Sequence, residues 1–417
     1  MSRKKTVKKQ DRTKKLTQKK TLKTKGELLL FTTPKNLIPK EILHMLSGLS
    51  LGIIIIGILY ISIDNRNIRT AFASSILGRV LVEDESQTDA EAEYIVTEEQ
   101  KRLAEEYQKN PIEPSGTMRN MPQYVVFAFD GSKSLDMWEE TRMFAKQMNE
   151  SGSKIHFTYF INPIYLLTAQ QAKEQYQPPR RDKGQSAIGY SENDIDTIKR
   201  RQQIRVAQTE GHEIASHAVG HYNGADWSLE EWRSELRQFD KIFYDGHTIS
   251  KNSVTGFRAP SLGQNKDLFI ALSELGYSYD TSLVGMARDL PKHEGGLWEF
   301  PVATIIFGRD EKPVLSMDYS IFMHQTKAKN IAFKGTELWQ NLYDETMYSY
   351  QKYFDDNYNG NHAPVYIAHH FSKWNDGVYF EVMKDFAKNV CSKKDVKCVT
   401  YSELQRELEK NLIEKEQ

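Results

Sequence analysis

Four polar side chains of the kind that carry out catalysis lie where predicted strands end. Asp130 closes the apolar run "VVFAF", His217 and His221 follow "EIAS", and Arg258 follows "VTGF". In a parallel α/β fold the carboxyl ends of the strands meet on one face, so these residues should converge on a single pocket. The sequence therefore predicts one site that combines a carboxylate, two imidazoles and a guanidinium group.

The stretch "GHEIASHAVGH" holds a candidate metal-binding pair. His217 and His221 are four residues apart, so a helical turn would direct both imidazoles the same way, toward an ion such as zinc. His212 is offset by five and is expected to be structural. A metal site needs a third ligand, for which Asp130 is the candidate; the alternative is a pair of buried, hydrogen-bonded histidines.

Two adjacent histidines, His369 and His370, follow "VYIA". Successive strand residues point to opposite faces, so only one can enter the pocket, and we predict His369. A histidine that titrates near neutrality can protonate a departing amine. Arg258 could orient a carboxylate or form a salt bridge at the rim. Asp280 in "YDTS" could cap a turn or hold a histidine in the tautomer needed for acid catalysis.

Strand-like and helix-like segments alternate from about residue 120 onward. This alternation predicts an α/β domain with a mainly parallel sheet, either closed into a barrel or doubly wound. Ser228 and Glu231 have the spacing of a capping box and predict the start of a helix. Residues 284–335 are rich in glycine, proline and aromatic residues, and we expect irregular loops there.

Five short motifs in chain order resemble the polysaccharide deacetylase family, also called carbohydrate esterase family 4 or the NodB homology domain. They are "AFDG", "SHAVGH", "RAPS", "YDTS" and "YIAHH", within residues 122–405. "FRAP", "LWEFPV" and "VYIAHHFSKW" look similar to the chitin deacetylase branch. The resemblance implies a distorted (β/α) barrel and a metal-dependent hydrolase that removes N-acetyl groups from a polysaccharide such as chitin or peptidoglycan.

The resemblance also implies a role for each matching residue. His217 and His221 would bind the divalent metal, with zinc as the expected ion, and Arg258 would orient the catalytic aspartate. Asp280 would hold the histidine of the fifth motif, and that histidine, His369, would protonate the amine.

Three further residues are implied as contacts of the substrate. The backbone N–H of Ser261 would stabilise the oxyanion, and Trp298 and Trp374 would wall the groove. Zinc would polarise the amide carbonyl and lower the pKa of its bound water from about 15.7 toward about 7.

The first motif departs from the family pattern, which has two consecutive aspartates, a base followed by a metal ligand. Here Gly131 follows Asp130. Either Asp130 is the base and the ligand is missing, or Asp130 is the ligand and the base is missing. Asp136 and Asp226 are candidates for the missing role. A glycan-binding module that has lost turnover, or a metal-independent amidase, are the competing hypotheses.

The N-terminal part predicts a membrane anchor. Residues 42–63 carry no charged side chain and would span about 30 Å as a helix, the thickness of a bilayer core. The arm 1–41 is basic, with 14 Lys and Arg in its first 40 residues, and the positive-inside rule leaves it cytoplasmic rather than bound to nucleic acid. An acidic linker, 64–117, then leads to an extracytoplasmic catalytic domain, 118–410. Cleavage after "AFA" or a buried core helix are the alternatives.

The only two cysteines, Cys391 and Cys398, lie close together in "CSKKDVKC". In an extracytoplasmic domain such a pair predicts a disulfide, the alternative being two free thiols. Two cysteines without neighbouring histidines are not expected to bind a metal.

Overall fold

The computed structural model describes residues 116–245, 250 and 253–416. The predicted basic arm, the predicted membrane helix 42–63 and almost all of the predicted linker lie outside these residues. Within the described ranges, no helix is both long and apolar enough to cross a membrane.

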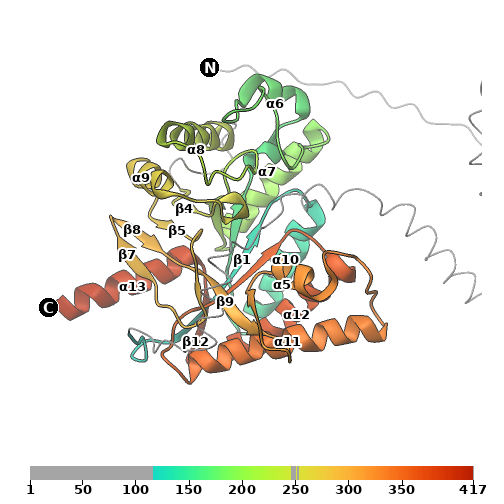
Figure 1. Cartoon of the computed structure of the whole chain (residues 1–417), viewed down its shortest axis with the longest axis vertical. Coiled ribbons are helices and arrows are strands. Elements are labelled where there is room, and N and C mark those ends of the chain that lie inside the picture. The colour runs from blue at the N-terminus through green and yellow to red at the C-terminus, as the bar shows by residue number, and fades with distance from the viewer. Residues whose placement is uncertain (1–115, 246–249, 251–252, 417) are drawn as a thin grey trace, which may run out of the picture. The chain divides into compact units, whose positions relative to one another are not determined.

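A twisted parallel sheet forms the centre of the domain (Figure 1). Its strands run in the order β11 (Val365–His370), β1 (Gln123–Asp130), β2 (Phe157–Ile161), β3 (Glu213–Ser216), β4 (Gly256–Phe257), β5 (Tyr279–Asp280), β8 (Leu297–Glu299) and β7 (Lys292–Glu294). β12 (Val396–Val399) also pairs with β1, and only β7 is antiparallel to its neighbour in this sheet. The predicted parallel α/β sheet is confirmed, but it is a curled half-barrel with ends at β11 and β7 and not a closed barrel.

Helices follow most of these strands. They are α5 (Leu135–Glu150), α6 (Ala169–Gln175), α7 (Asp194–Thr209), α8 (Leu229–Tyr244), α9 (Lys266–Glu274), α10 (Asp318–Thr326), α11 (Glu337–Tyr358), α12 (Trp374–Cys391) and α13 (Tyr401–Glu416). The predicted capping box is present at the start of α8, where Ser228 and Glu231 cap each other's backbone. Figure 1 shows α11 and α12 side by side beneath the sheet.

The segment 284–335 is more regular than predicted. It contains β6 (Val284–Met286), β9 (Val302–Phe307) and β10 (Lys312–Leu315), which form a second sheet, as well as β7, β8 and α10. The expectation of irregular loops is therefore wrong. Most of these strands are only three or four residues long, and the apolar run of β9 is almost continuously buried, so neither gives a periodic signal.

Strand β1 is buried on both faces, and its alternation divides the core. Val125, Phe127 and Phe129 belong to the larger cluster, which also contains core residues of α5 and α12. Tyr124, Val126 and Ala128 point the other way, into a second cluster inside the curl of the sheet. We call this second cluster the inner cluster and the larger one the outer cluster. By the same alternation, the side chain of Asp130 lies on the face of β1 that meets the inner cluster.

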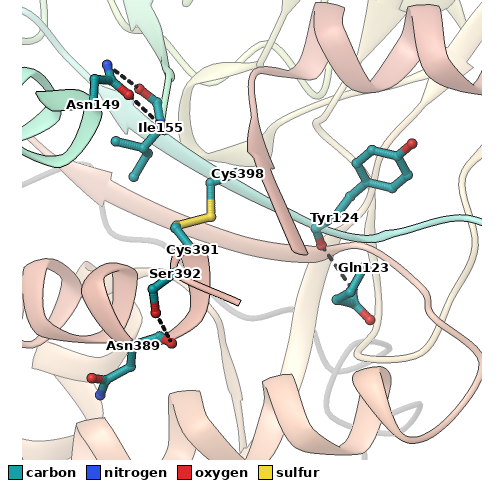
Figure 2. The surroundings of a disulfide bond; sticks show 8 residues. All are labelled: Gln123, Tyr124, Asn149, Ile155, Asn389, Cys391, Ser392 and Cys398. Carbon is teal, nitrogen blue, oxygen red and sulfur yellow. Dashed lines mark hydrogen bonds between the residues drawn. A yellow bond between two sulfur atoms is a disulfide. The ribbon is translucent and has the colours of Figure 1, made fainter. Parts of the chain in front are cut away.

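A disulfide joins Cys391, at the end of α12, to Cys398 on β12 (Figure 2). Their Cα atoms are 5.7 Å apart, and Cys398 is the register partner of Val125 on β1. The predicted disulfide is thus present, and it ties the last turn of α12 to a strand beside β1.

Candidate functional site

A pocket opens at the carboxyl ends of the central strands. Its lining includes Asp130, His217, His221, Ser261, His370 and Trp374. It encloses about 60 Å³. The expected convergence is therefore observed for Asp130, His217 and His221, whereas Arg258 is not part of this lining and reaches the site through Asp130.

Arg258 holds Asp130 in place. Its guanidinium Nη1 donates to Asp130 Oδ1 over 2.7 Å, and both side chains are almost completely buried. Nη2 donates to the hydroxyl of Tyr401 at 3.1 Å, and the guanidinium carbon lies 4.3 Å from the centre of the Phe160 ring. Because the guanidinium is fixed by several contacts, the direction of the Asp130 carboxylate is fixed as well. The structure thus shows Arg258 orienting Asp130, the contact that the resemblance implies.

The two histidines of the second motif lie in a loop and not on a helical turn. Ala218 and His221 both adopt left-handed backbone conformations, with φ of 55° and 60°. The prediction of a helical turn is therefore wrong, yet the two rings still meet, with centroids 5.0 Å apart. His217 Nδ1 donates to the carbonyl of Arg258 at 2.8 Å, which leaves its Nε2 as the unprotonated nitrogen when the ring is neutral.

Burial keeps both of these imidazoles neutral. It lowers the pKa of His217 to about 4 and that of His221 well below its ordinary 6.5, the latter helped by the neighbouring His217. Within the described part of the chain, His221 Nδ1 is buried without a hydrogen-bond partner. Neutral imidazoles with available nitrogens are suitable metal ligands.

The predicted metal triad of Asp130, His217 and His221 is not assembled. Among the described residues there is no group of three His, Cys, Asp or Glu side chains arranged to hold a metal ion. Asp130 is directed to Arg258 instead. Gly131 also borders the pocket, and a Cβ built there would meet nothing within 4 Å. The donor set therefore fits two ligands of a metal site and lacks the third.

His370, and not the predicted His369, lines the pocket. On β11, Val365 and Ile367 belong to the outer cluster, so His369 points outward, where its ring lies 6.0 Å from that of Phe129. The side chain of His370 lies on the other face of β11, toward the inside of the curled sheet, where the pocket is. The choice of His369 was wrong because the face of β11 that meets the pocket depends on its register with β1.

Asp318 holds His370, a role that the resemblance gave to Asp280. Asp318 Oδ1 lies 2.7 Å from His370 Nδ1, and Oδ2 accepts the backbone N–H of the same residue at 2.9 Å. Oδ2 is also 3.4 Å from Nδ1 of His369. Burial alone would raise the pKa of Asp318, but His370 and His369 hold it well below its usual range.

Sequence reasoning missed Asp318 because it lies in the segment expected to be irregular. The preceding residue, Met317, forms an isolated parallel bridge with Ala368 of β11, and this long-range pairing brings Asp318 next to His370. No local sequence pattern predicts a pairing between segments this far apart.

Asp280 is buried, and its carboxylate accepts hydrogen bonds from the backbone N–H and the hydroxyl of Ser282, both at 2.7 Å. In the described structure its hydrogen bonds stay within this turn. The predicted contact with the histidine of the fifth motif is therefore not formed, and the alternative of a turn residue is observed.

The buried Asp280 carboxyl predicts a pH-dependent stability. Burial, opposed by the Ser282 hydrogen bonds, raises its pKa from 3.8 to about 7, so between these values the folded protein binds more protons than the unfolded chain. The contribution of Asp280 to stability therefore falls as pH rises from about 4 to about 7. We expect Asp280→Asn to raise the melting temperature more at about pH 8 than at about pH 5. The exposed Asp136→Asn is the control, and an equal change at both pH values would contradict the prediction.

The predicted substrate contacts divide into two groups. Ser261 lines the pocket on the short 3-10 helix η2 (Pro260–Leu262), with a φ of 53°. Trp374 lines it too and stacks on Phe322, with ring centroids 5.2 Å apart. Trp298 does not belong to the described lining; it stacks on Phe300 in the inner cluster, and its indole N–H donates to Glu409. The prediction for Trp298 is therefore wrong.

The remaining acidic candidates, Asp136 and Asp226, lie outside the pocket lining, and His212 is structural. Asp136 is exposed in the first turn of α5, and Asp226 forms a surface salt bridge of 2.7 Å with Arg180. His212 accepts the backbone N–H of Phe157 at 3.0 Å, as its structural assignment predicts.

Comparisons with known proteins confirm the resemblance. Residues 152–279 match a family model described as polysaccharide deacetylase, and this range contains His217, His221 and Arg258 but not Asp130 or His370. Chitin deacetylase 1 of Bombyx mori is 25% identical over 175 residues, which are 40% of this chain and 26% of that protein. The matched region thus spans about a quarter of the length of this curated relative.

The solved structures to which the chain is similar include two from Bacillus. A peptidoglycan deacetylase from Bacillus subtilis has 12% identity and a TM-score of 0.37, with 71% of this chain and 95% of that chain covered. A family 4 carbohydrate esterase pseudoenzyme from Bacillus anthracis has 10% identity and a TM-score of 0.37, with 70% and 68% covered.

Proposed function

We propose that this chain, whose residues 152–279 match the polysaccharide deacetylases, hydrolyses N-acetyl groups on a polysaccharide of the chitin or peptidoglycan type. One observation carries the proposal. Asp130 and His370 are register partners at the ends of adjacent strands, β1 and β11, and both line the same pocket. Each is held by a buried side chain: Arg258 contacts Asp130, and Asp318 contacts His370.

This pair of side chains can supply the base and the acid of amide hydrolysis. Asp130 accepts a proton from the water that attacks the carbonyl carbon, and His370 donates a proton to the nitrogen as the C–N bond breaks. Asp318 Oδ1 lies 2.7 Å from Nδ1 of His370 and orients the ring that delivers the proton. The products are acetate and a free amine on the sugar.

A divalent metal ion, with zinc as the expected one, would polarise the carbonyl in such a hydrolase. His217 and His221 are the ligands that we propose for it. Because the described residues lack a third ligand, we assign no catalytic step to the metal.

The size of the pocket supports the substrate class. Its volume of about 60 Å³ is far below the ~300–1,000 Å³ of sites that enclose a drug-sized ligand. A group as small as an acetyl fits this volume, so we place the acetyl inside the pocket and the sugar that bears it outside.

We further propose that the domain works outside the cytoplasm, anchored by residues 42–63 with the basic arm inside. The Cys391–Cys398 disulfide supports this placement, because disulfides persist in oxidising compartments. The long apolar segment and the basic arm in front of it support the orientation.

A glycan-binding module is the second candidate function, and the observation that favours it is the first motif, where Asp130 is followed by Gly131 and not by a second aspartate. The two functions differ in turnover. The full chain is incubated with N-acetylated chitin oligosaccharides and with peptidoglycan, and acetate and bound glycan are both measured. We expect acetate release from one of them; glycan binding without acetate from either would favour the binding module.

A further inference from the structure

The loop that carries the histidine pair, residues 217–221, has no helical hydrogen bonds of its own. Left-handed residues at both ends, Ala218 and His221, prevent a regular turn. Its backbone groups nevertheless lie in the buried interior and need partners, since an unpaired buried amide costs about 1–3 kcal/mol.

Two buried side chains, from different elements of the fold, supply several of these partners. The Asn162 amide donates to the carbonyls of His217 and Ala218. The carboxylate of Glu235 on α8 accepts the N–H groups of Val219 and Gly220, at 2.8 and 3.3 Å, through its Oε1. Two backbone bonds add to them: the His217 N–H donates to the Ile161 carbonyl, and the Gly220 carbonyl accepts the N–H of Ala187.

Glu235 is completely buried, among apolar side chains of α8 such as Leu236 and Phe239. A carboxylate in such a place is stable only when donors satisfy it. Besides the two loop amides, the Tyr176 hydroxyl lies 3.0 Å from each of its oxygens. Its described hydrogen-bond partners are therefore the loop and the tyrosine.

The loop backbone also packs directly on this tyrosine. A Cβ placed on Gly220 would lie 2.6 Å from the Tyr176 hydroxyl oxygen, so glycine is required for the close approach. The loop between the two histidines therefore packs at Gly220 on a buried pair of side chains, Tyr176 and Glu235.

We propose that Glu235 is a positioning residue that sets the relative placement of the His217 and His221 imidazoles through the backbone of the loop between them. The placement of the rings does not depend on what the pocket catalyses, whereas its importance for catalysis rests on the proposed function. A substitution at residue 235 should therefore act on these two rings before any substrate is added.

The test compares three substitutions on α8 by NMR of the histidine ring nitrogens in the full chain labelled with ¹⁵N-histidine. Spectra of His217→Gln and His221→Gln assign the two rings. Glu235→Leu removes the acceptor of the loop amides, and we expect the signals of both rings to shift or broaden. Glu235→Gln keeps an acceptor oxygen for these amides and should preserve the wild-type signals.

Leu236→Ala is the control for general destabilisation, because Leu236 is equally buried on the same helix and its apolar side chain cannot accept the loop amides. We expect a lower melting temperature for this variant with unchanged ring signals. Unchanged signals in Glu235→Leu, or equal shifts in Leu236→Ala, would overturn the proposal. Because the readout needs no substrate, its outcome is separate from whether acetate is released.

Discussion

Asp130→Asn is expected to lower kcat for acetate release by about 10²–10⁴-fold, the usual contribution of a general base. Asparagine keeps the shape of the side chain and an oxygen for Arg258, but its amide cannot accept the proton of the attacking water. Steady-state kinetics on an N-acetylated oligosaccharide provide the measurement.

The variant needs two checks. Removing the charge leaves Arg258 buried beside a neutral group, and breaking a buried ion pair costs up to about 3–5 kcal/mol, so the melting temperature must show that the protein is folded. The matched control is Asp136→Asn, an exposed aspartate outside the pocket lining, which should keep the wild-type rate. A folded Asp130→Asn enzyme with wild-type kcat would exclude Asp130 as the base.

Gly131→Asp is expected to raise the affinity of the full chain for zinc by about tenfold or more, equivalent to about 1.4 kcal/mol. Residue 131 borders the same pocket as His217 and His221, and a side chain there would enter open space. A carboxylate at this position would add the third ligand that a zinc site requires. Isothermal titration calorimetry with zinc alone measures the change.

The backbone at residue 131 makes asparagine the proper control. Its φ of 80° lies in the left-handed region, where a side chain costs of the order of 1–3 kcal/mol and where Asp and Asn are tolerated best. Gly131→Asn carries the same strain with a neutral side chain, and we expect it to bind zinc as the wild type does. Equal affinity for the Asp and Asn variants would show that residue 131 is not the missing ligand position.

The parallel sheet and the convergence of the site could be predicted because both depend on local signals. Apolar runs that end in Asp130, in His217 or in Arg258 define strand ends, and strand ends of a parallel sheet meet on one face. The Arg258–Asp130 pair was implied by the resemblance and is present in the structure. The two cysteines likewise predicted their disulfide.

What could not be predicted depends on pairings between distant segments. The choice between His369 and His370 is set by the register of β11 on β1, where Asp130 pairs with His370. Asp318 reaches His370 only through the bridge between Met317 and Ala368. A local pattern contains no information on either register.

The histidine loop shows a different limit. The spacing of His217 and His221 correctly suggested that the rings meet, but for the wrong reason, since the loop is not helical. The backbone of this loop is instead held by hydrogen bonds to the side chains of Glu235 and Asn162, which come from other elements of the fold. A short-range spacing rule can thus agree with a geometry that long-range contacts produce.

If the pocket of Asp130 and His370 removes acetyl groups by attack of water, one oxygen atom of each acetate comes from the solvent. The most direct measurement is mass spectrometry of the acetate released from an N-acetylated glycan by the full chain in ¹⁸O-labelled water. We predict one heavy oxygen in each acetate released by the wild type, and about 10²-fold or more slower formation of labelled acetate by Asp130→Asn. Acetate without the label, or labelled acetate formed equally by both proteins, would contradict this mechanism.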